Sequence, residues 1–269
     1  MNGKDYLKIG RAVELDDLKE RRLYRFLEIL PALLSWSTLF LLIFLSWSAP
    51  FWMAIFIIAF DVYWFFKTIF LSLHMRSAFN KMKKNLKKNW LNELESVQIK
   101  SEVLTGTSWR EIYHLVILPM YKETLEVARP SFLSLTKVNY PLDKFIVVLA
   151  IEERGGEAAL LVAREIEKEF GDKFFRFLVT IHPKDISGEI AGKGSNETWA
   201  IKEAKTKIID ELKISYEKII VSVFDIDTIS HHDYFSHLTH TYLSSGKPLR
   251  SSFQPIPLFV NNIWQAPAF

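Results

Sequence analysis

The chain has 269 residues, of which 49% are hydrophobic, and a formal net charge of +3 at pH 7. This apolar content excludes an intrinsically disordered chain and is enough for a buried core and more than one structural unit. The sequence contains no cysteine, which excludes disulfides, thiolate metal sites and a cysteine nucleophile, and fits a reducing compartment.

Two long apolar runs lie in the N-terminal third of the sequence. They occupy residues 30–47 and 51–73, close to the roughly 20 residues that cross a bilayer as a helix. Only residues 48–50 separate them, so the sequence predicts a transmembrane helical hairpin over residues 27–74. A cleaved signal peptide is not expected, because the first run begins late, is long and is followed by a second.

Basic residues flank both outer ends of the predicted hairpin, and none lies in its turn. The positive-inside rule therefore predicts a multi-pass protein of the cell inner (cytoplasmic) membrane, with both flanks and the rest of the chain on the cytoplasmic side. Residues 1–26 are expected to be a basic cytoplasmic segment, and residues 75–111 a basic juxtamembrane linker. The basic residues are Lys4, Lys8, Arg11, Lys19, Arg21, Arg22 and Arg25 before the hairpin, and Arg76, Lys81, Lys83, Lys84, Lys87 and Lys88 after it.

Two features next to the bilayer leave alternatives open. Residues 76–94 carry apolar side chains at spacings of three and four, which predicts a basic amphipathic helix. Such a helix either lies on an anionic leaflet or packs on the soluble domain. Asp61 interrupts the second apolar run and is interpreted either as a helix-packing residue or as a contact to substrate or lipid.

From about residue 112 the pattern alternates between short apolar runs and helical periods, which predicts an α/β domain with a mostly parallel sheet. The predicted strands are residues 113–119, 144–151, 175–181, 218–224 and 249–254, and the predicted helices are 123–136, 156–170, 196–213 and 231–244.

Polar clusters follow each of the first four predicted strands. The carboxyl ends of parallel strands meet at one edge of a sheet, which is where open α/β sheets bind ligands. The clusters are therefore expected to form one site, with Pro119, Tyr121 and Glu123 after the first strand, Glu152 and Glu153 after the second, Lys193 and Asn196 after the third, and Asp225 and Asp227 after the fourth.

Of these clusters, the pair Asp225 and Asp227 gives the most definite chemical prediction. In an extended segment both carboxylates point to the same side, because side chains alternate with a period of two. A hard divalent cation such as Mg²⁺ or Mn²⁺ would relieve their repulsion. The alternative is a solvated strand end that leads into a helix.

Several common motifs are absent from the sequence. Neither the glycine pattern of dinucleotide-binding folds nor that of the P-loop is present, and the H-E-x-x-H and G-x-S-x-G patterns are missing as well. Nucleic-acid binding fits poorly beside a membrane hairpin. For His231 and His232, a place at the start of a helix is preferred to the alternative role as metal ligands.

The motifs LVILPMYKE, FIVVLAIEE, AGKGSN and VFDIDT, in this order after a membrane hairpin, resemble those of the inverting family 2 glycosyltransferases. The resemblance covers about residues 112 to 260. It implies a nucleotide-diphospho-sugar transferase-like α/β/α domain over residues 112–269. It also implies transfer of a sugar from a nucleotide-diphosphate donor, with a UDP-sugar as first candidate, to a polysaccharide, lipid or other acceptor.

The resemblance also implies a role for each candidate residue. The first-strand cluster would frame the nucleotide base and ribose, and one acid of the second cluster would contact the uracil or ribose. Lys193 and Asn196 would lie near the donor. Asp225 and Asp227 would contact the sugar and the Mg²⁺ or Mn²⁺ ion that bridges the diphosphate.

The chain departs from the family in two places. Lys122 stands where the family has Asn, and the acidic pair after the second strand is Glu-Glu where Asp-Asp is typical. The family's general base and acceptor-binding motif follow the region that matches residues 261–264, so both are expected beyond Phe269. Two alternative functions are a nucleotidyltransferase of related fold and a non-catalytic membrane scaffold.

Overall fold

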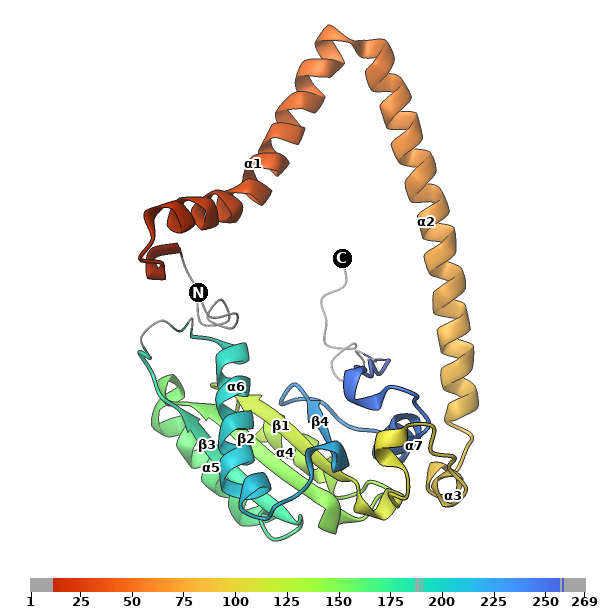
Figure 1. The fold of residues 1–269 in the computed structure, drawn as a ribbon, viewed down its shortest axis with the longest axis vertical. Coiled ribbons are helices and arrows are strands. Elements are labelled where there is room, and N and C mark those ends of the chain that lie inside the picture. The colour runs from red at the N-terminus through yellow and green to blue at the C-terminus, as the bar shows by residue number, and fades with distance from the viewer. Residues whose placement is uncertain (1–11, 187–188, 190, 257, 259–269) are drawn as a thin grey trace. The chain divides into compact units, whose positions relative to one another are not determined.

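The structure of the chain is a computed structural model that describes residues 12–186, 189, 191–256 and 258. The chain divides into two compact units, the first with two long helices that end at Asn85 and the second, from Leu86 on, with the sheet (Figure 1). The basic residues before residue 12 lie outside the described residues. So do residues 259–269, which bear on the expectation that the general base and the acceptor-binding motif lie beyond Phe269.

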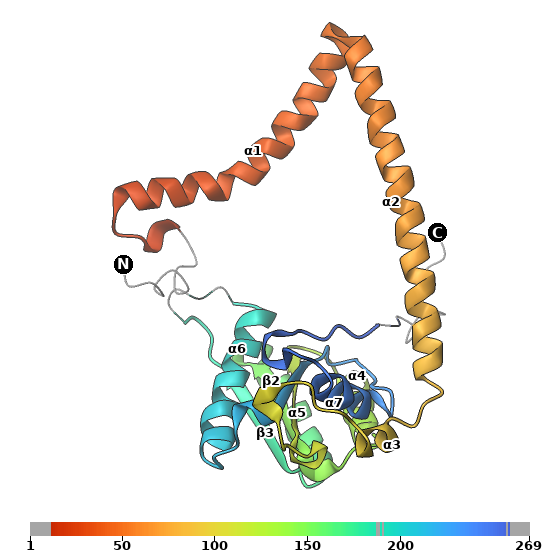
Figure 2. The ribbon, with the colours of Figure 1, turned by 45° about the vertical axis from the view of Figure 1, so that its right-hand side comes forward.

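The first unit consists mainly of α1 (Leu18–Ser48) and α2 (Pro50–Asn85), which are separated by Ala49 alone. Asp17 caps α1, because its side chain accepts a hydrogen bond of 2.7 Å from the backbone N–H of Lys19. Pro31 inside α1 removes a backbone hydrogen bond, and α1 is visibly bent (Figures 1 and 2). By length and composition, both helices are apolar enough to cross a membrane.

The prediction of one continuous amphipathic helix over residues 76–94 is wrong. Its first part continues α2 to Asn85, and after a break the short helix α3 (Trp90–Glu95) begins. Asn89 caps the N-terminus of α3, because its Oδ1 accepts a 3.1 Å hydrogen bond from the N–H of Asn92. Trp90 and Leu94 are buried in the second unit, so this part of the expected linker packs on the sheet domain.

The sheet has four parallel strands in the order β3-β2-β1-β4. The strands are β1 (Tyr113–Met120), β2 (Phe145–Glu152), β3 (Arg176–His182) and β4 (Ile219–Val223). They match four of the five predicted strands and confirm the α/β class. β1 lies between β2 and β4 and is buried from His114 to Met120, which explains its nearly continuous apolar sequence.

The fifth predicted strand, over residues 249–254, is not formed. A 3₁₀ turn (Pro248–Arg250) occupies its start, and residues 251–256 are irregular. Pro248 and Pro255 flank the segment, and neither has a backbone N–H to donate to a neighbouring strand. β4 is therefore an edge strand among the described residues, with Val221 and Val223 exposed.

Helices cover both faces of the sheet (Figures 1 and 2). One face packs against α3 together with α4 (Leu125–Leu135), α5 (Gly156–Phe170) and α7 (Tyr234–Leu243). The other face packs against α6 (Lys193–Ala204) and its π-helical continuation Lys205–Asp210. α6 begins three residues earlier than predicted, so Lys193 lies in its first turn.

His114 is a buried titratable group in the central strand. Its Nε2 lies 2.9 Å from Oγ1 of Thr239 in α7, and its ring packs against Tyr140, Phe145 and Phe235. Burial lowers the pKa of His114 from 6.5 to about 3. The folded chain therefore holds this imidazole neutral at pH values where an unfolded chain binds a proton.

This shift predicts acid-sensitive stability. Because the folded pKa lies below the unfolded one, the unfolded state binds more protons at any pH below about 6.5, and acid favours unfolding. The contribution of His114 is expected to reduce the free energy of unfolding by up to about 1.4 kcal/mol for each pH unit between about 6 and 3. Urea unfolding of the detergent-purified chain at several pH values measures it.

The matched control is His114→Leu, which removes the titration and leaves the other ionisable groups in place. The variant should be less stable at neutral pH, because the buried hydrogen bond between His114 and Thr239 is lost, but its stability should fall less steeply with acid. Equal slopes for the variant and the parent would show that His114 is not the source of the acid sensitivity.

Candidate functional site

The candidate residues lie around the carboxyl edge of the sheet, where the strand order reverses. The chain runs outward from β1 through β2 to β3, and then returns to the other side of β1 to form β4. Ligand sites of open α/β sheets occur at such a switch point, outside the carboxyl ends of the strands. The segments after β1 and β4 flank this point, and those after β2 and β3 adjoin it.

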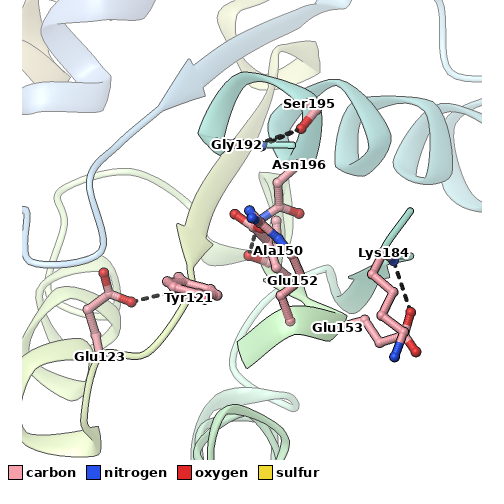
Figure 3. Close-up of polar contacts among 10 residues, drawn as sticks. Tyr121, Glu123, Ala150, Glu152, Glu153, Lys184, Gly192, Ser195 and Asn196 are labelled. Atoms are coloured by element: carbon pink, nitrogen blue, oxygen red, sulfur yellow. Dashed lines mark hydrogen bonds and ion pairs between the residues drawn. The ribbon is translucent and has the colours of Figure 1, made fainter. Parts of the chain in front are cut away.

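The segment after β1 is fixed by one carboxylate. Oε2 of Glu123 accepts hydrogen bonds from the backbone N–H groups of Tyr121, at 2.7 Å, and Lys122, at 3.0 Å. Figure 3 shows this side chain folded back toward Tyr121. Pro119 is buried inside β1, in register with Ala150, so it shapes the strand end from within. Glu123 thus orders the turn that presents the Tyr121 ring.

Arg154 is a site residue that the sequence analysis did not select. Its Nε donates a 2.9 Å hydrogen bond to Oε2 of Glu152, a buried carboxylate at the end of β2. Its guanidinium also lies over the ring of Tyr121, 5.4 Å from the ring centroid. The bond to Glu152 raises the pKa of Arg154 above its usual value. Arg154 thereby connects the ends of β1 and β2.

The turn from β2 into α5 approaches the end of β1 very closely. A Cβ atom on Gly155 would lie 2.3 Å from the backbone oxygen of Tyr121, so only glycine fits there. The preceding Glu153 is exposed and accepts a 2.9 Å hydrogen bond from the N–H of Lys184, in the segment after β3 (Figure 3). The ends of three strands are thus joined by direct contacts.

Asn196 connects α6 to the same edge. Its side chain is only 1% exposed, and its Nδ2 donates a 2.8 Å hydrogen bond to the carbonyl of Ala150 in β2 (Figure 3). Its Oδ1 is buried with no hydrogen-bond partner within the described part of the chain. A buried amide oxygen without a donor is unfavourable, so this position favours an incoming donor group from a ligand or water.

Asp225 and Asp227 do not lie in the strand, because β4 ends at Val223 and the two acids belong to the turn that follows. Between them, Ile226 is buried, and its carbonyl accepts a 2.6 Å hydrogen bond from Oγ of Ser131 in α4. Both aspartates are exposed. The expected alternation therefore persists in the turn, with the apolar residue inward and the flanking carboxylates outward.

Lys193 and Asp225 come together as an ion pair across the site. The ammonium group of Lys193, in the first turn of α6, contacts Oδ1 of Asp225, and both side chains are more than half exposed. The same ammonium lies 3.9 Å from Oε1 of Glu197. The structure thus brings the predicted lysine and the predicted aspartate into contact, although 32 positions separate them in the sequence.

The exposed aspartates have the chemistry of a hard-cation site. Mg²⁺ binds through one or two carboxylates together with water and substrate phosphates, and two exposed carboxylates on one turn fit this requirement. An ion at Asp225 would have to share or displace the contact with Lys193. Oxygen donors favour Mg²⁺ and Mn²⁺ over softer ions.

The chain matches no protein-family model and no curated protein. The side chains of the site therefore provide the basis for inferring which ligands it can bind. It combines two exposed carboxylates, a lysine at a helix N-terminus, a buried amide and an aromatic ring beside an arginine–glutamate pair.

Gly155 offers a direct test of the close packing at the strand ends. Gly155→Ala is expected to lower the free energy of unfolding by about 1–3 kcal/mol, because the new methyl group would overlap the Tyr121 carbonyl. Chemical unfolding followed by tryptophan fluorescence measures the loss. Gly194→Ala is the matched control, since a Cβ there meets nothing within 4 Å and alanine favours the helix. Equal stability of the two variants would contradict the packing described.

Proposed function

We propose that this chain is a membrane-bound glycosyltransferase that binds a nucleotide-diphosphate sugar at the carboxyl edge of its sheet. The observation that carries the proposal is the meeting of Lys193 with Asp225, beside Asp227, at the switch point of a parallel sheet. The site brings together a cation for phosphate and carboxylates for a metal, which is what a diphosphate leaving group requires.

The chemistry on the α6 side supports binding of the diphosphate. Backbone N–H groups at a helix N-terminus attract phosphate, and Lys193 adds a full positive charge in the same turn. Mg²⁺ or Mn²⁺ held by Asp225 and Asp227 would supply Lewis acidity to the departing nucleoside diphosphate. Lys193 can turn from Asp225 to a phosphate oxygen, because both groups are exposed.

The chemistry on the β1 and β2 side supports binding of the nucleoside. The ring of Tyr121 offers a flat surface for a base, and Glu152 can accept hydrogen bonds from base N–H or ribose hydroxyl groups. Glu123, Glu153 and Asn196 hold the surrounding backbone in place. A UDP-sugar is the proposed donor, and a polysaccharide, lipid or other glycan the proposed acceptor.

A scaffold without catalysis is the second candidate, and one observation favours it. Each of four candidate acids already has a partner inside the chain: Asp225 contacts Lys193, Glu152 contacts Arg154, and Glu123 and Glu153 accept backbone hydrogen bonds. Acids satisfied in this way stabilise a fold without any ligand. Ligand binding separates the two proposals.

We also propose that α1 and α2 cross the cytoplasmic membrane and leave the sheet domain on the cytoplasmic side. Both helices expose large apolar side chains, such as Phe40 in α1 and Phe70 in α2, over spans long enough for a bilayer. The basic residues of α2 beyond its apolar part are exposed and suit contact with anionic headgroups.

The donor site predicts metal-dependent nucleotide binding. Calorimetric titration of UDP into the detergent-purified chain is expected to show binding with Mn²⁺ or Mg²⁺ that is lost with chelator. Asp225→Asn/Asp227→Asn should weaken it by at least about 10-fold, because charge-assisted contacts are removed. A matched control is Asp143→Asn/Asp172→Asn, two acids that precede β2 and β3 at the opposite edge of the sheet.

The competing functions give different results in the same titration. Preference for a nucleoside triphosphate, with release of pyrophosphate, would favour a nucleotidyltransferase. A folded chain that binds neither UDP nor a triphosphate would favour the scaffold. Equal loss in the two double variants would show that the effect is not specific to the Asp225–Asp227 turn.

The absence of cysteine makes the topology testable by labelling. A single cysteine introduced as Ser48→Cys, at the end of α1, is expected to react with a membrane-impermeant maleimide in intact cells. Lys202→Cys, on an exposed position of α6, should react only after the cells are permeabilised. The reverse pattern would place the sheet domain outside the cytoplasm, and labelling of both cysteines in intact cells would exclude the proposed crossing.

A further inference from the structure

Two histidines and an aspartate come together in the loop between β4 and α7. Among the described residues, His231, His232 and Asp233 form a group whose potential ligand atoms all lie within 4.8 Å of one another. The two imidazole rings are 4.0 Å apart between centroids, and Nε2 of His232 lies 3.1 Å from Oδ2 of Asp233. Both histidines are exposed, so an ion can reach them from solvent.

We propose that His231, His232 and Asp233 bind a divalent transition metal ion of the zinc type, with a ligand set separate from Asp225 and Asp227. Two imidazoles and one carboxylate are ligands that Zn²⁺ takes in proteins, with the remaining position filled by water. The pair Asp225 and Asp227 offers oxygen alone and suits Mg²⁺ or Mn²⁺. The same loop would thus hold two chemically different cation sites.

One spacing between two of the ligand atoms already fits such an ion. Ligands at about 2.0–2.1 Å from a tetrahedral Zn²⁺ lie about 3.3 Å from one another. The Nε2 of His232 and the Oδ2 of Asp233 are already at 3.1 Å, close to one edge of that tetrahedron. Metal binding requires a neutral imidazole and an ionised carboxylate, so any proton on Nε2 of His232 would be released to solvent as the ion binds.

Asn139 orients the group from outside. Its Nδ2 donates a 2.8 Å hydrogen bond to Oδ1 of Asp233, which leaves Oδ2 directed toward His232. Its backbone N–H donates a 2.7 Å hydrogen bond to the carbonyl of His232. Partners of this kind fix the orientation of metal ligands and raise affinity. Asn139 is therefore assigned as a positioning residue for this site.

The proposed ion would brace the loop that also carries Asp227. Ser230, next to His231, donates its N–H to Oγ of Ser134 at 3.1 Å, so the loop is held by α4 just before the histidines. Asp233 is the residue before α7 and is buried. A metal bound here would connect the loop to the start of α7 and raise the thermal stability of the folded chain.

The test is titration of Zn²⁺ into the 269-residue chain, purified in detergent without a histidine tag. One bound ion per chain is expected. His231→Gln/His232→Gln should weaken binding by more than the roughly 10- to 100-fold loss that is typical when a ligand's hydrogen-bond partner is removed, and Asn139→Ala should fall within that range. Saturating Zn²⁺ should raise the melting midpoint of the parent chain and leave that of the histidine double variant unchanged.

Two controls make the result specific. Asp225→Asn/Asp227→Asn should bind Zn²⁺ like the parent, and His74→Gln, a histidine in α2, should do the same. If the histidine double variant fails to fold, the single variants His231→Gln and His232→Gln replace it, with the absorption of bound Co²⁺ as readout. Equal Zn²⁺ affinity in the parent and the histidine variants, or loss of binding in the Asp225–Asp227 variant instead, would overturn the proposal.

Discussion

The hydrogen bonds between α4 and the loop after β4 are the constraint on which both candidate sites depend. Ser131 binds the carbonyl of Ile226, and Ser134 accepts the N–H of Ser230. Asn139, just beyond α4, donates its N–H to the carbonyl of His232. The loop has no regular hydrogen-bond ladder of its own, so these contacts supply what a strand or helix would have supplied. A short polar face of one helix thereby positions the acids and the histidines together.

Internal pairing shapes the chemistry of the carboxyl edge. Arg154 pairs with Glu152, two residues before it, and Lys193 pairs with Asp225 from another segment. Backbone amides donate hydrogen bonds to Glu123. The Lys193–Asp225 pair is exposed, so breaking it costs little free energy, and a ligand can compete for both partners. Glu152 is buried beside Arg154, so removal of the arginine would leave a buried charge and cost far more. At the carboxyl edge, a ligand can therefore replace the contact between Lys193 and Asp225, whereas the contact between Arg154 and Glu152 stays fixed.

The sequence predicted the parts that depend on apolar patterning. β1 and β2 were recognisable because burial on both faces demands continuous apolar runs. The polar clusters after the strands fell on one edge because parallel strands share a direction. Side-chain hydrogen bonds were harder to anticipate. Nothing in the pattern of residues 76–94 distinguished one helix from two helices divided by the cap at Asn89. The residues at 249–254 predicted a strand, but Pro248 and Pro255 on either side cannot donate hydrogen bonds to a neighbouring strand. Arg154 and Gly155 were missed because their roles depend on contacts with Tyr121, a residue of another strand end.

The strand order has a consequence for how the protein is made. β1 is an inner strand of the sheet, yet its partner on one side is β4, the last strand among the described residues, with Tyr113 opposite Ile219. During synthesis the apolar helices emerge first, and β1 can pair with β2 early, while its other edge stays open until β4 leaves the ribosome. The nascent domain thus carries an unpaired apolar strand through much of its translation. An open edge of this kind can pair with other chains, so the growing polypeptide is most exposed to aggregation and to chaperones before Ile219 has been added.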